Sequence, residues 1–234
     1  MKKNYIDKEI KKERLRQKHL KRPDKRMSGR RKGINYHRLP YQEEMKILES
    51  NLRNDIALND YAFQNFHKEL IRDIKTVGDE QFRVTNLKAQ TTRWNMAKDF
   101  KSFKELLDII VKHHLKYYIQ DGPFMGNLDV VCPDMWGSIY KKGDYAIEHS
   151  HNPADISFVY YVKATKDCSP IIFTEPAVCS FQPKEGMLLI WDAKYKHMVP
   201  ESIIDEERIV IAGNFAWKTR HLGVARGKVN EVEK

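Results

Sequence analysis

The sequence has few cysteines and no long apolar run. Its three cysteines, Cys132, Cys168 and Cys179, are widely spaced. This odd, scattered set argues against a disulfide framework and a cysteine-based zinc site, and it predicts a reducing compartment such as the cytoplasm. No run approaches the roughly 18 apolar residues that a membrane-spanning helix needs. The first residues are charged and lack an apolar stretch, so we expect no secretory signal.

Glycine-rich motifs are also missing. The sequence contains neither a phosphate-binding loop nor a dinucleotide-binding glycine motif. Ser157 is not surrounded by the Gly-x-Ser-x-Gly turn that presents a hydrolase nucleophile. Nucleotide-dependent and serine-hydrolase chemistries therefore have no support in this sequence.

The positive charge is concentrated at one end of the chain. The formal net charge is +10, but residues 1–38 alone hold 16 basic and 4 acidic residues, a net charge of +12. We therefore expect a flexible basic arm over 1–35, attached to a nearly neutral domain. Such an arm suits nucleic acid or another polyanion. The alternative is a solvated tail that binds nothing specific, because the arm lacks the interleaved aromatic residues of many nucleic-acid-binding surfaces.

Composition divides the rest of the chain into three parts. Residues 36–126 have a helical pattern, 127–217 are rich in β-branched and aromatic residues, and 218–234 form a polar tail. Apolar spacings of three and four predict two helices between Tyr41 and about Ile74. A further helix should begin near Ser102, which has capping-box spacing to Glu105.

About eight short strands are expected after Gly126. They are Leu128–Cys132, Met135–Tyr140, Tyr145–His149, Ile156–Lys163, Ile171–Thr174, Ala177–Gln182, Met187–Trp191 and Arg208–Trp217. Closely spaced strands after a helical part indicate an α+β fold, with a β-sandwich or barrel-like jelly roll on which the N-terminal helices pack.

Three histidines are candidate metal ligands. His149 and His151 are two residues apart, so on a strand they would project to the same side. A jelly roll can bring His197 to the same point, and imidazoles with open positions suit Fe(II), Zn, Cu or Ni. The alternative is that all three are ordinary surface or core histidines. His113 and His114 would diverge by about 100° on a helix, so we expect them to be surface or packing histidines of that helix.

An arginine follows the last of these histidines. Arg208 opens a strand on which it shares one face with Val210, Ala212 and Asn214, while Ile209, Ile211 and Phe215 share the other. Burying arginine is costly unless it meets an anion, and its planar fork suits a carboxylate. The alternative is a salt bridge with Glu206, Glu207 or another acid.

Taken in order, these motifs resemble the Fe(II)- and 2-oxoglutarate-dependent dioxygenases, most closely the prolyl-hydroxylase-like group common in bacterial and phage genomes. The resemblance covers about Leu128 to Phe215. It is carried by Tyr140-x-x-Gly143, His149-x-His151, Ser157-Phe-Val-Tyr160-Tyr161-Val162, Gly186-x-Leu-x-Ile-Trp191, His197-x-Val-Pro200 and Arg208-Ile-x-Ile-Ala-x-Asn214.

The resemblance implies a double-stranded β-helix, Fe(II), 2-oxoglutarate as co-substrate and O2. It also implies hydroxylation of a substrate with release of succinate and CO2. His149 and His197 would be iron ligands. Arg208 would bind the distal carboxylate of 2-oxoglutarate, Tyr140 would hydrogen-bond the same carboxylate, and Asn214 would line the pocket.

The sequence departs from the family at His151, which stands where an aspartate is usual. His151 is the favoured third ligand because of its spacing from His149. Asp155 is its rival, since a carboxylate completes the common facial triad. A third possibility leaves the position to water or halide.

Two other functions remain open from the sequence. One is a three-histidine, cupin-like metalloenzyme that does not use 2-oxoglutarate. The other is a polyanion-binding protein that acts through the basic arm.

Overall fold

The computed structural model describes residues 45–55, 59–79, 86–120 and 130–218. All of them belong to one unit, Glu43–Lys234. The expected basic arm over 1–35 lies outside the described residues, and so does the expected tail apart from Lys218. The four-part division of the chain therefore stays a prediction.

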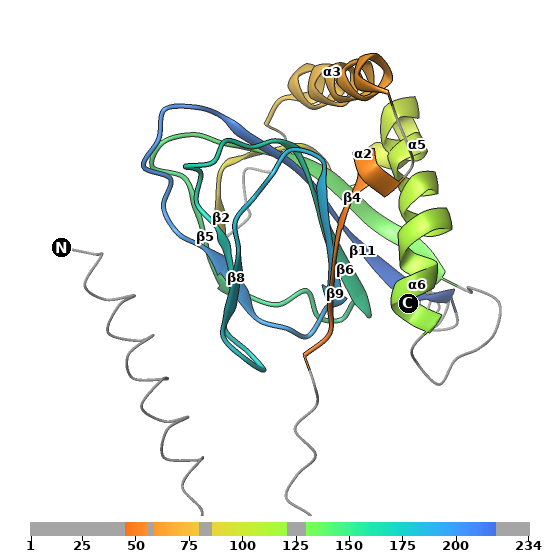
Figure 1. The fold of residues 1–234 in the computed structure, drawn as a ribbon. Coiled ribbons are helices and arrows are strands. Elements are labelled where there is room, and N and C mark those ends of the chain that lie inside the picture. Colours follow the sequence, from red (N-terminus) through yellow and green to blue (C-terminus); the bar gives the residue numbers. More distant parts are fainter. Residues whose placement is uncertain (1–44, 56–58, 80–85, 121–129, 219–234) are drawn as a thin grey trace, which may run out of the picture. The chain divides into compact units, whose positions relative to one another are not determined.

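Two antiparallel sheets form the body of this unit (Figure 1). The larger sheet has the order β1-β9-β6-β11-β4-β3, and the smaller one has the order β2-β5-β10-β7-β8. In the larger sheet the strands are β1 (Ile47–Asn51), β9 (Met187–Asp192), β6 (Ile156–Lys163), β11 (Arg208–Trp217), β4 (Val130–Tyr140) and β3 (Gln90–Thr91). In the smaller sheet they are β2 (Leu87–Lys88), β5 (Tyr145–His149), β10 (His197–Val199), β7 (Ile171–Phe173) and β8 (Cys179–Phe181). This arrangement is the expected double-stranded β-helix.

The larger sheet is apolar on both faces. Because successive side chains of a strand alternate between faces, β6 turns Phe158, Tyr160 and Val162 toward one core and Val159 and Tyr161 toward the other. The same alternation on β11 sends Ile209, Ile211 and Phe215 to the first core. Arg208, Val210, Ala212 and Asn214 line the space between the sheets, as the sequence predicted.

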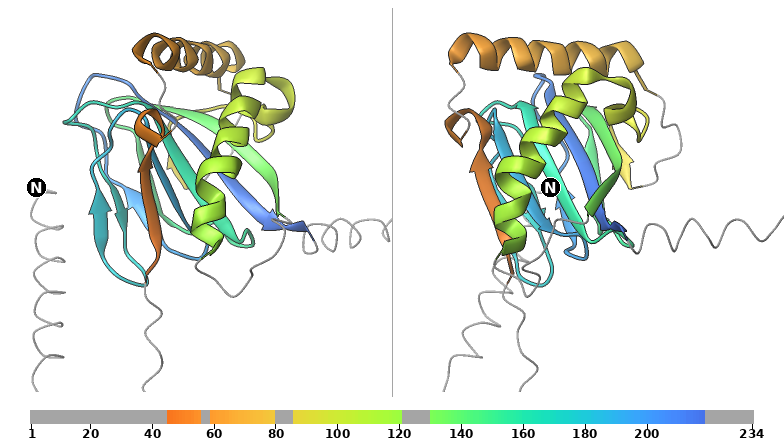
Figure 2. Two further views of the ribbon diagram at one scale, coloured as in Figure 1. Left: turned by 45° about the vertical axis from the view of Figure 1, so that its right-hand side comes forward. Right: turned by 90° about the vertical axis from the view of Figure 1, so that its right-hand side faces the viewer.

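Helices cover the first of these faces (Figure 2). They are α3 (Asp60–Val77) and a continuous run of α5 (Lys101–Ile110), a π-helical segment η1 (Val111–Leu115) and α6 (Lys116–Gln120). Two shorter helices are α2 (Leu52–Asp55) and α4 (Met96–Asp99). Leu70 and Ile74 of α3, and Phe103 and Leu106 of α5, are buried in this layer.

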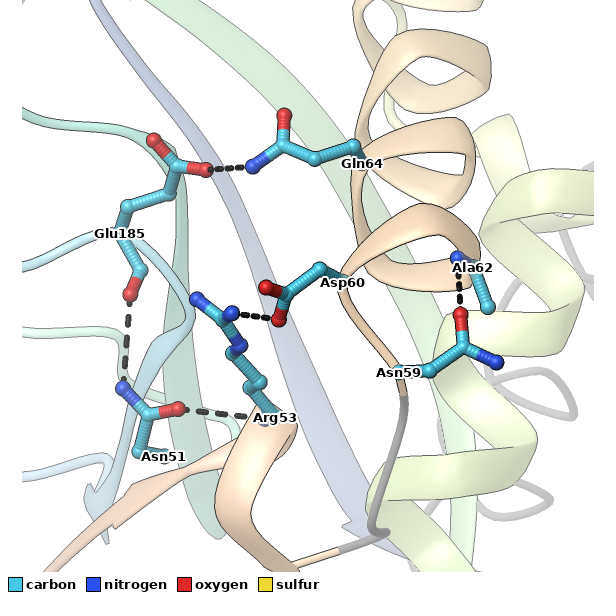
Figure 3. Close-up of polar contacts among 7 residues, drawn as sticks. All are labelled: Asn51, Arg53, Asn59, Asp60, Ala62, Gln64 and Glu185. Atoms are coloured by element: carbon cyan, nitrogen blue, oxygen red, sulfur yellow. Dashed lines mark hydrogen bonds and ion pairs between the residues drawn. The ribbon is translucent and has the colours of Figure 1, made fainter.

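Polar contacts attach the start of α3 to the turn before β9 (Figure 3). Asn59 caps the helix by accepting a hydrogen bond from the Ala62 amide at 2.9 Å. Gln64 donates to the Glu185 carboxylate at 3.3 Å, and Arg53 pairs with Asp60. The capped end of the helix is thus held against the larger sheet.

Three local expectations were wrong. Residues 47–51 form an edge strand that pairs with β9 from Ile47↔Trp191 to Asn51↔Met187, where a helix was expected. Pairing with a neighbouring strand outweighs the local helical spacing there. The strands expected over 128–132 and 135–140 are one strand, β4, in the described residues. Ser102 does not cap its helix, because its hydroxyl donates to Asp73 Oδ2 at 2.6 Å.

Among the described helices, none is both long and apolar enough to span a membrane.

Gly137 lets α3 approach β4, which gives a test of the fold. A Cβ atom at Gly137 would lie 2.5 Å from Cγ1 of Ile74. Gly137→Ala should therefore lower the free energy of unfolding by about 1–3 kcal/mol, and Ile74→Ala alone should lower it by about 2–5 kcal/mol. The double variant should lose less than the sum, because the smaller residue 74 makes room. Urea denaturation measures all three, and strictly additive losses would contradict this packing.

Candidate metal centre

The smaller sheet and the loop after β5 bring the three histidines together. In the antiparallel pairing of β10 with β5, His197 lies opposite His149. His151 follows the end of β5, where its backbone amide donates to the Ala193 carbonyl at 2.8 Å. Residues distant in sequence therefore converge through strand pairing and one loop contact.

The imidazole rings surround one point. The ring centroids are 5.2 Å apart for His149 and His151, 4.4 Å for His149 and His197, and 5.1 Å for His151 and His197. One nitrogen from each ring lies within 4.8 Å of the others. Ligands about 2.0–2.1 Å from a common ion are separated by no more than about 4.2 Å, so small movements would close this group around a metal.

Hydrogen bonds select the nitrogen that each ring presents. His149 Nδ1 lies 2.7 Å from the Ile147 carbonyl, and His197 Nδ1 lies 3.2 Å from the Tyr195 carbonyl. A carbonyl only accepts, so each Nδ1 carries the proton and each Nε2 keeps its lone pair for a metal. Asn214 hydrogen-bonds with His151 and accepts from Ser157 at 2.9 Å. Each of the three candidate ligand rings is therefore oriented by a hydrogen bond.

The rings are held neutral. Burial lowers the pKa of His149, and it lowers the pKa of His197 well below the ordinary value, with His149 and His151 adding to the effect. Burial, and then the neighbouring His149, lowers the pKa of His151 from 6.5 to about 4. Neutral imidazole is the form that binds a metal, so the group is ready for an ion near neutral pH.

Asp155 is directed elsewhere. Its carboxylate accepts from the Trp217 backbone amide at 3.0 Å, and its own carbonyl accepts from Ala193 at 3.1 Å. Asp155 does not belong to the histidine group. In the described residues it anchors the loop that carries His151, and the only residues that converge are histidines.

A cavity of about 970 Å³ extends from the histidines between the two sheets. At one end lies Arg208, which is only 4% exposed. Its guanidinium carbon is 3.9 Å from the Tyr140 ring centroid, and its Nη1 donates to the Ser169 carbonyl at 2.8 Å. Arg208 has no acidic partner among the described residues. Of the acids considered from the sequence, Glu207 pairs instead with Lys75 at 3.0 Å.

Arg208 keeps unused hydrogen-bonding capacity beside the cavity. Its buried Nε has no hydrogen-bond partner in the described part of the chain. Burial raises the pKa of Tyr140, while Arg208 acts in the opposite direction through its charge and a hydrogen bond. A cation with an orphaned donor next to a neutral phenol is suited to an anion.

Two residues of the sequence motifs line the cavity, although the sequence analysis gave them no role there. Tyr161 and Trp191 both line the cavity and are buried, and the Trp191 ring lies edge-on to His197 at 5.2 Å. The alternation of side chains between the two faces of β6 and β9 could have predicted that they face the cavity. Asn214 lines the cavity, as expected, and its side chain contacts His151, six residues along β11 from Arg208. Its expected contact with the co-substrate stays a prediction.

On sequence, no known family matches the chain, and no curated protein matches it. On structure, it is similar to a prolyl-4-hydroxylase from Pseudomonas putida, with 17% identity and a TM-score of 0.56 over 74% of this chain and 93% of that one. It is also similar to the viral collagen prolyl hydroxylase of Paramecium bursaria Chlorella virus-1 in its 2-oxoglutarate complex. There the identity is 14% and the TM-score 0.54, over 75% of this chain and 98% of that one.

A third similar structure is a prolyl hydroxylase from Trichoplax adhaerens, in complex with a peptide of the hypoxia-inducible factor oxygen degradation domain. Its identity is 14% and its TM-score 0.55, over 75% of this chain and 86% of that one. The fold of the chain is the one shared by these 2-oxoglutarate-dependent oxygenases. The double-stranded β-helix expected from the sequence motifs is confirmed.

Metal titration separates His151 from Asp155 as the third ligand. His151→Ala should weaken Fe(II) binding about 100-fold or more, because even a change behind a ligand costs 10–100-fold. Asp155→Ala should keep one bound ion per chain, although it removes the acceptor of the Trp217 amide. Anaerobic isothermal titration calorimetry measures both, with the exposed His113→Ala as control. Loss of binding in Asp155→Ala alone would reverse the assignment.

The depressed pKa of His151 predicts how stability depends on pH. In the unfolded chain this histidine takes up a proton near pH 6.5, whereas the folded protein takes it up only near pH 4. The metal-free protein should therefore lose stability as the pH falls through this window. His151→Gln removes the titration, so its free energy of unfolding should fall less steeply. Urea unfolding in the presence of a chelator measures the slopes, and equal slopes would refute the explanation.

Proposed function

We propose that the protein is an Fe(II)- and 2-oxoglutarate-dependent oxygenase that hydroxylates a substrate with release of succinate and CO2. The observation that carries this is a single cavity holding three converging neutral imidazoles and a buried arginine without an acidic partner in the described chain. A simple metal site needs no such arginine. A site for a metal together with an anionic co-substrate does.

The residues present fit this metal. Imidazole nitrogen is a suitable donor for Fe(II), and three ligands leave open positions. Three neutral histidines contribute no negative charge, so the full charge of the ion is left for a dianionic ligand to balance. When bound, the iron, 2-oxoglutarate and O2 supply the oxidising chemistry, in which the co-substrate is decarboxylated to succinate as a substrate C–H bond is hydroxylated.

The chain itself binds, orients and shields. Arg208 would hold the distal carboxylate of 2-oxoglutarate through the donors that Ser169 does not use, with the Tyr140 hydroxyl beside it. The Ser169 carbonyl fixes the position of the guanidinium. His149 and His197 are held in one tautomer by backbone carbonyls. Trp191 and Tyr161 keep the inner part of the cavity apolar, which strengthens each of these electrostatic contacts.

The alternative is a three-histidine metalloenzyme that does not use 2-oxoglutarate. The all-histidine ligand set favours it, whereas the buried Arg208 does not.

The structures similar to this chain hold substrates of different chemical classes. One similar structure holds a peptide, and another, HygX from Streptomyces hygroscopicus, holds hygromycin B. Polyanion binding through residues 1–35 and a cytoplasmic location, in a host cell if the chain is phage-encoded, remain proposals from composition alone.

Replacing Arg208 separates the two functions. Arg208→Met should leave Fe(II) binding intact but weaken 2-oxoglutarate binding about 30-fold or more, because the loss of one partner of a buried, hydrogen-bonded charge pair costs 2 kcal/mol or more. The control is Lys142→Met, which removes an exposed cation paired with Asp205 at 3.1 Å. Calorimetry under anaerobic conditions and succinate assays in air provide the readouts. Unchanged 2-oxoglutarate affinity in Arg208→Met, or no 2-oxoglutarate binding by the folded, metal-loaded wild type, would favour the alternative.

A further inference from the structure

The cavity has a second end, opposite Arg208. The pairing of β11 with β4 begins at Arg208↔Tyr140 and passes through Asn214↔Asp134 before it ends at Trp217↔Val130. All four residues of the first two of these pairs line the cavity. The proposed co-substrate occupies the Arg208 end, and His151 contacts Asn214 and Trp136 farther along. The end at Asp134 is therefore left for the substrate, if the proposed function holds.

Two tryptophans and a carboxylate form this end. Trp136 and Asp134 lie on the cavity face of β4, because the residue between them, Met135, points into the helix-covered core. Trp94 is held beside them, since its carbonyl accepts from the Met135 amide at 2.6 Å. The two indole rings meet edge-to-face, with centroids 4.5 Å apart and planes at 70°.

Trp94 is open to solvent. It is 44% exposed and also lines the cavity. Trp136 is buried and its ring stacks on His151 with centroids 6.0 Å apart. The indoles thus extend from the metal ligands toward solvent, along the path that a substrate would take.

The charge of this end is negative and unbalanced. Within the described chain the Asp134 carboxylate has no ion-pair partner. Among the described residues that line the cavity, Arg208 is the only lysine or arginine, and it lies at the other end. A bound divalent ion and a dianionic co-substrate would cancel each other. The charges of Arg208 and Asp134 would then remain in different parts of the loaded site, with no cation beside Asp134 among the described lining residues.

We propose that the Asp134 end of the cavity binds a cationic group of the substrate, either a protonated amine or a guanidinium. The proposal rests on the oxygenase function. Tryptophan is the aromatic residue that attracts cations most strongly over its face, and a carboxylate forms charge-assisted hydrogen bonds with ammonium and guanidinium groups. Phosphate-rich substrates would be repelled by Asp134. The same chemistry therefore disfavours a nucleic acid strand in this part of the cavity.

Matched small probes test the proposal. The probes are the N-acetyl methylamides of lysine and arginine, their neutral counterparts norleucine and citrulline, and the acidic counterpart glutamate. Binding to protein loaded with Fe(II) and 2-oxoglutarate under anaerobic conditions is followed through the indole N–H resonances of Trp94 and Trp136. The cationic probes should bind about tenfold more tightly than their neutral counterparts, as expected for one carboxylate aided by aromatic faces.

Variants connect this preference to the named residues. Asp134→Asn and Trp94→Leu should each remove most of the preference for cationic over neutral probes while 2-oxoglutarate binding stays at the wild-type level. The control Asp205→Asn changes an exposed carboxylate that pairs with Lys142, and it should keep the preference. Circular dichroism checks that each variant is folded.

Three outcomes would overturn the proposal: neutral or acidic probes that bind as tightly as the cationic ones, an unchanged preference in Asp134→Asn, or no binding of any cationic probe at millimolar concentration. Failure of the oxygenase function is recognised separately, because it appears as a lack of 2-oxoglutarate binding in the wild type before any probe is added. If the protein binds metal but not 2-oxoglutarate and still prefers cationic probes, the cation-binding site is supported and the oxygenase function is contradicted.

Discussion

The alternation of side chains across the larger sheet is the constraint on which the site depends. Each central strand must satisfy two apolar environments, the helix-covered core on one face and the cavity on the other. On β6 this places Tyr160 in the helical layer and Tyr161 in the cavity. A one-residue slip in register would exchange the two sets of side chains. The helices therefore contribute to the site indirectly. They bury one set of side chains of the larger sheet, so the other set must face the cavity.

Burial makes the polar groups of the cavity dependent on one another. Imidazoles held neutral by burial carry no cost of a buried charge, but a buried guanidinium does. Arg208 reduces that cost with the Ser169 carbonyl and the face of Tyr140, and it still keeps one orphaned donor. Unmet hydrogen-bonding capacity of this kind destabilises a protein unless a ligand satisfies it. The arrangement is therefore understandable as a binding site and difficult to understand as packing.

Sequence patterns predicted those parts of the fold that depend on local periodicity. The i, i+2 spacing of His149 and His151 and the alternation after Arg208 were enough to propose their common direction. The sequence did not reveal that β1 is a strand, because its pairing with β9 is nonlocal and overrides a helical spacing. The role of Asp155 was equally hidden. Its partner, the Trp217 amide, lies 62 residues away, and no spacing rule connects them.

The two ends of the cavity carry opposite charge, and this polarity bears on the all-histidine ligand set. A carboxylate ligand would add a negative charge at the metal and weaken its attraction for an anionic co-substrate. With three neutral imidazoles, the ion and Arg208 act together on a dianion, while the negative charge of the cavity lies instead at Asp134. With the carboxylate at Asp134 and not on the metal, an anion would be directed toward Arg208 and a cation toward Asp134. In the proposed site, His151 is then one part of a charge distribution that orders two ligands in a single cavity.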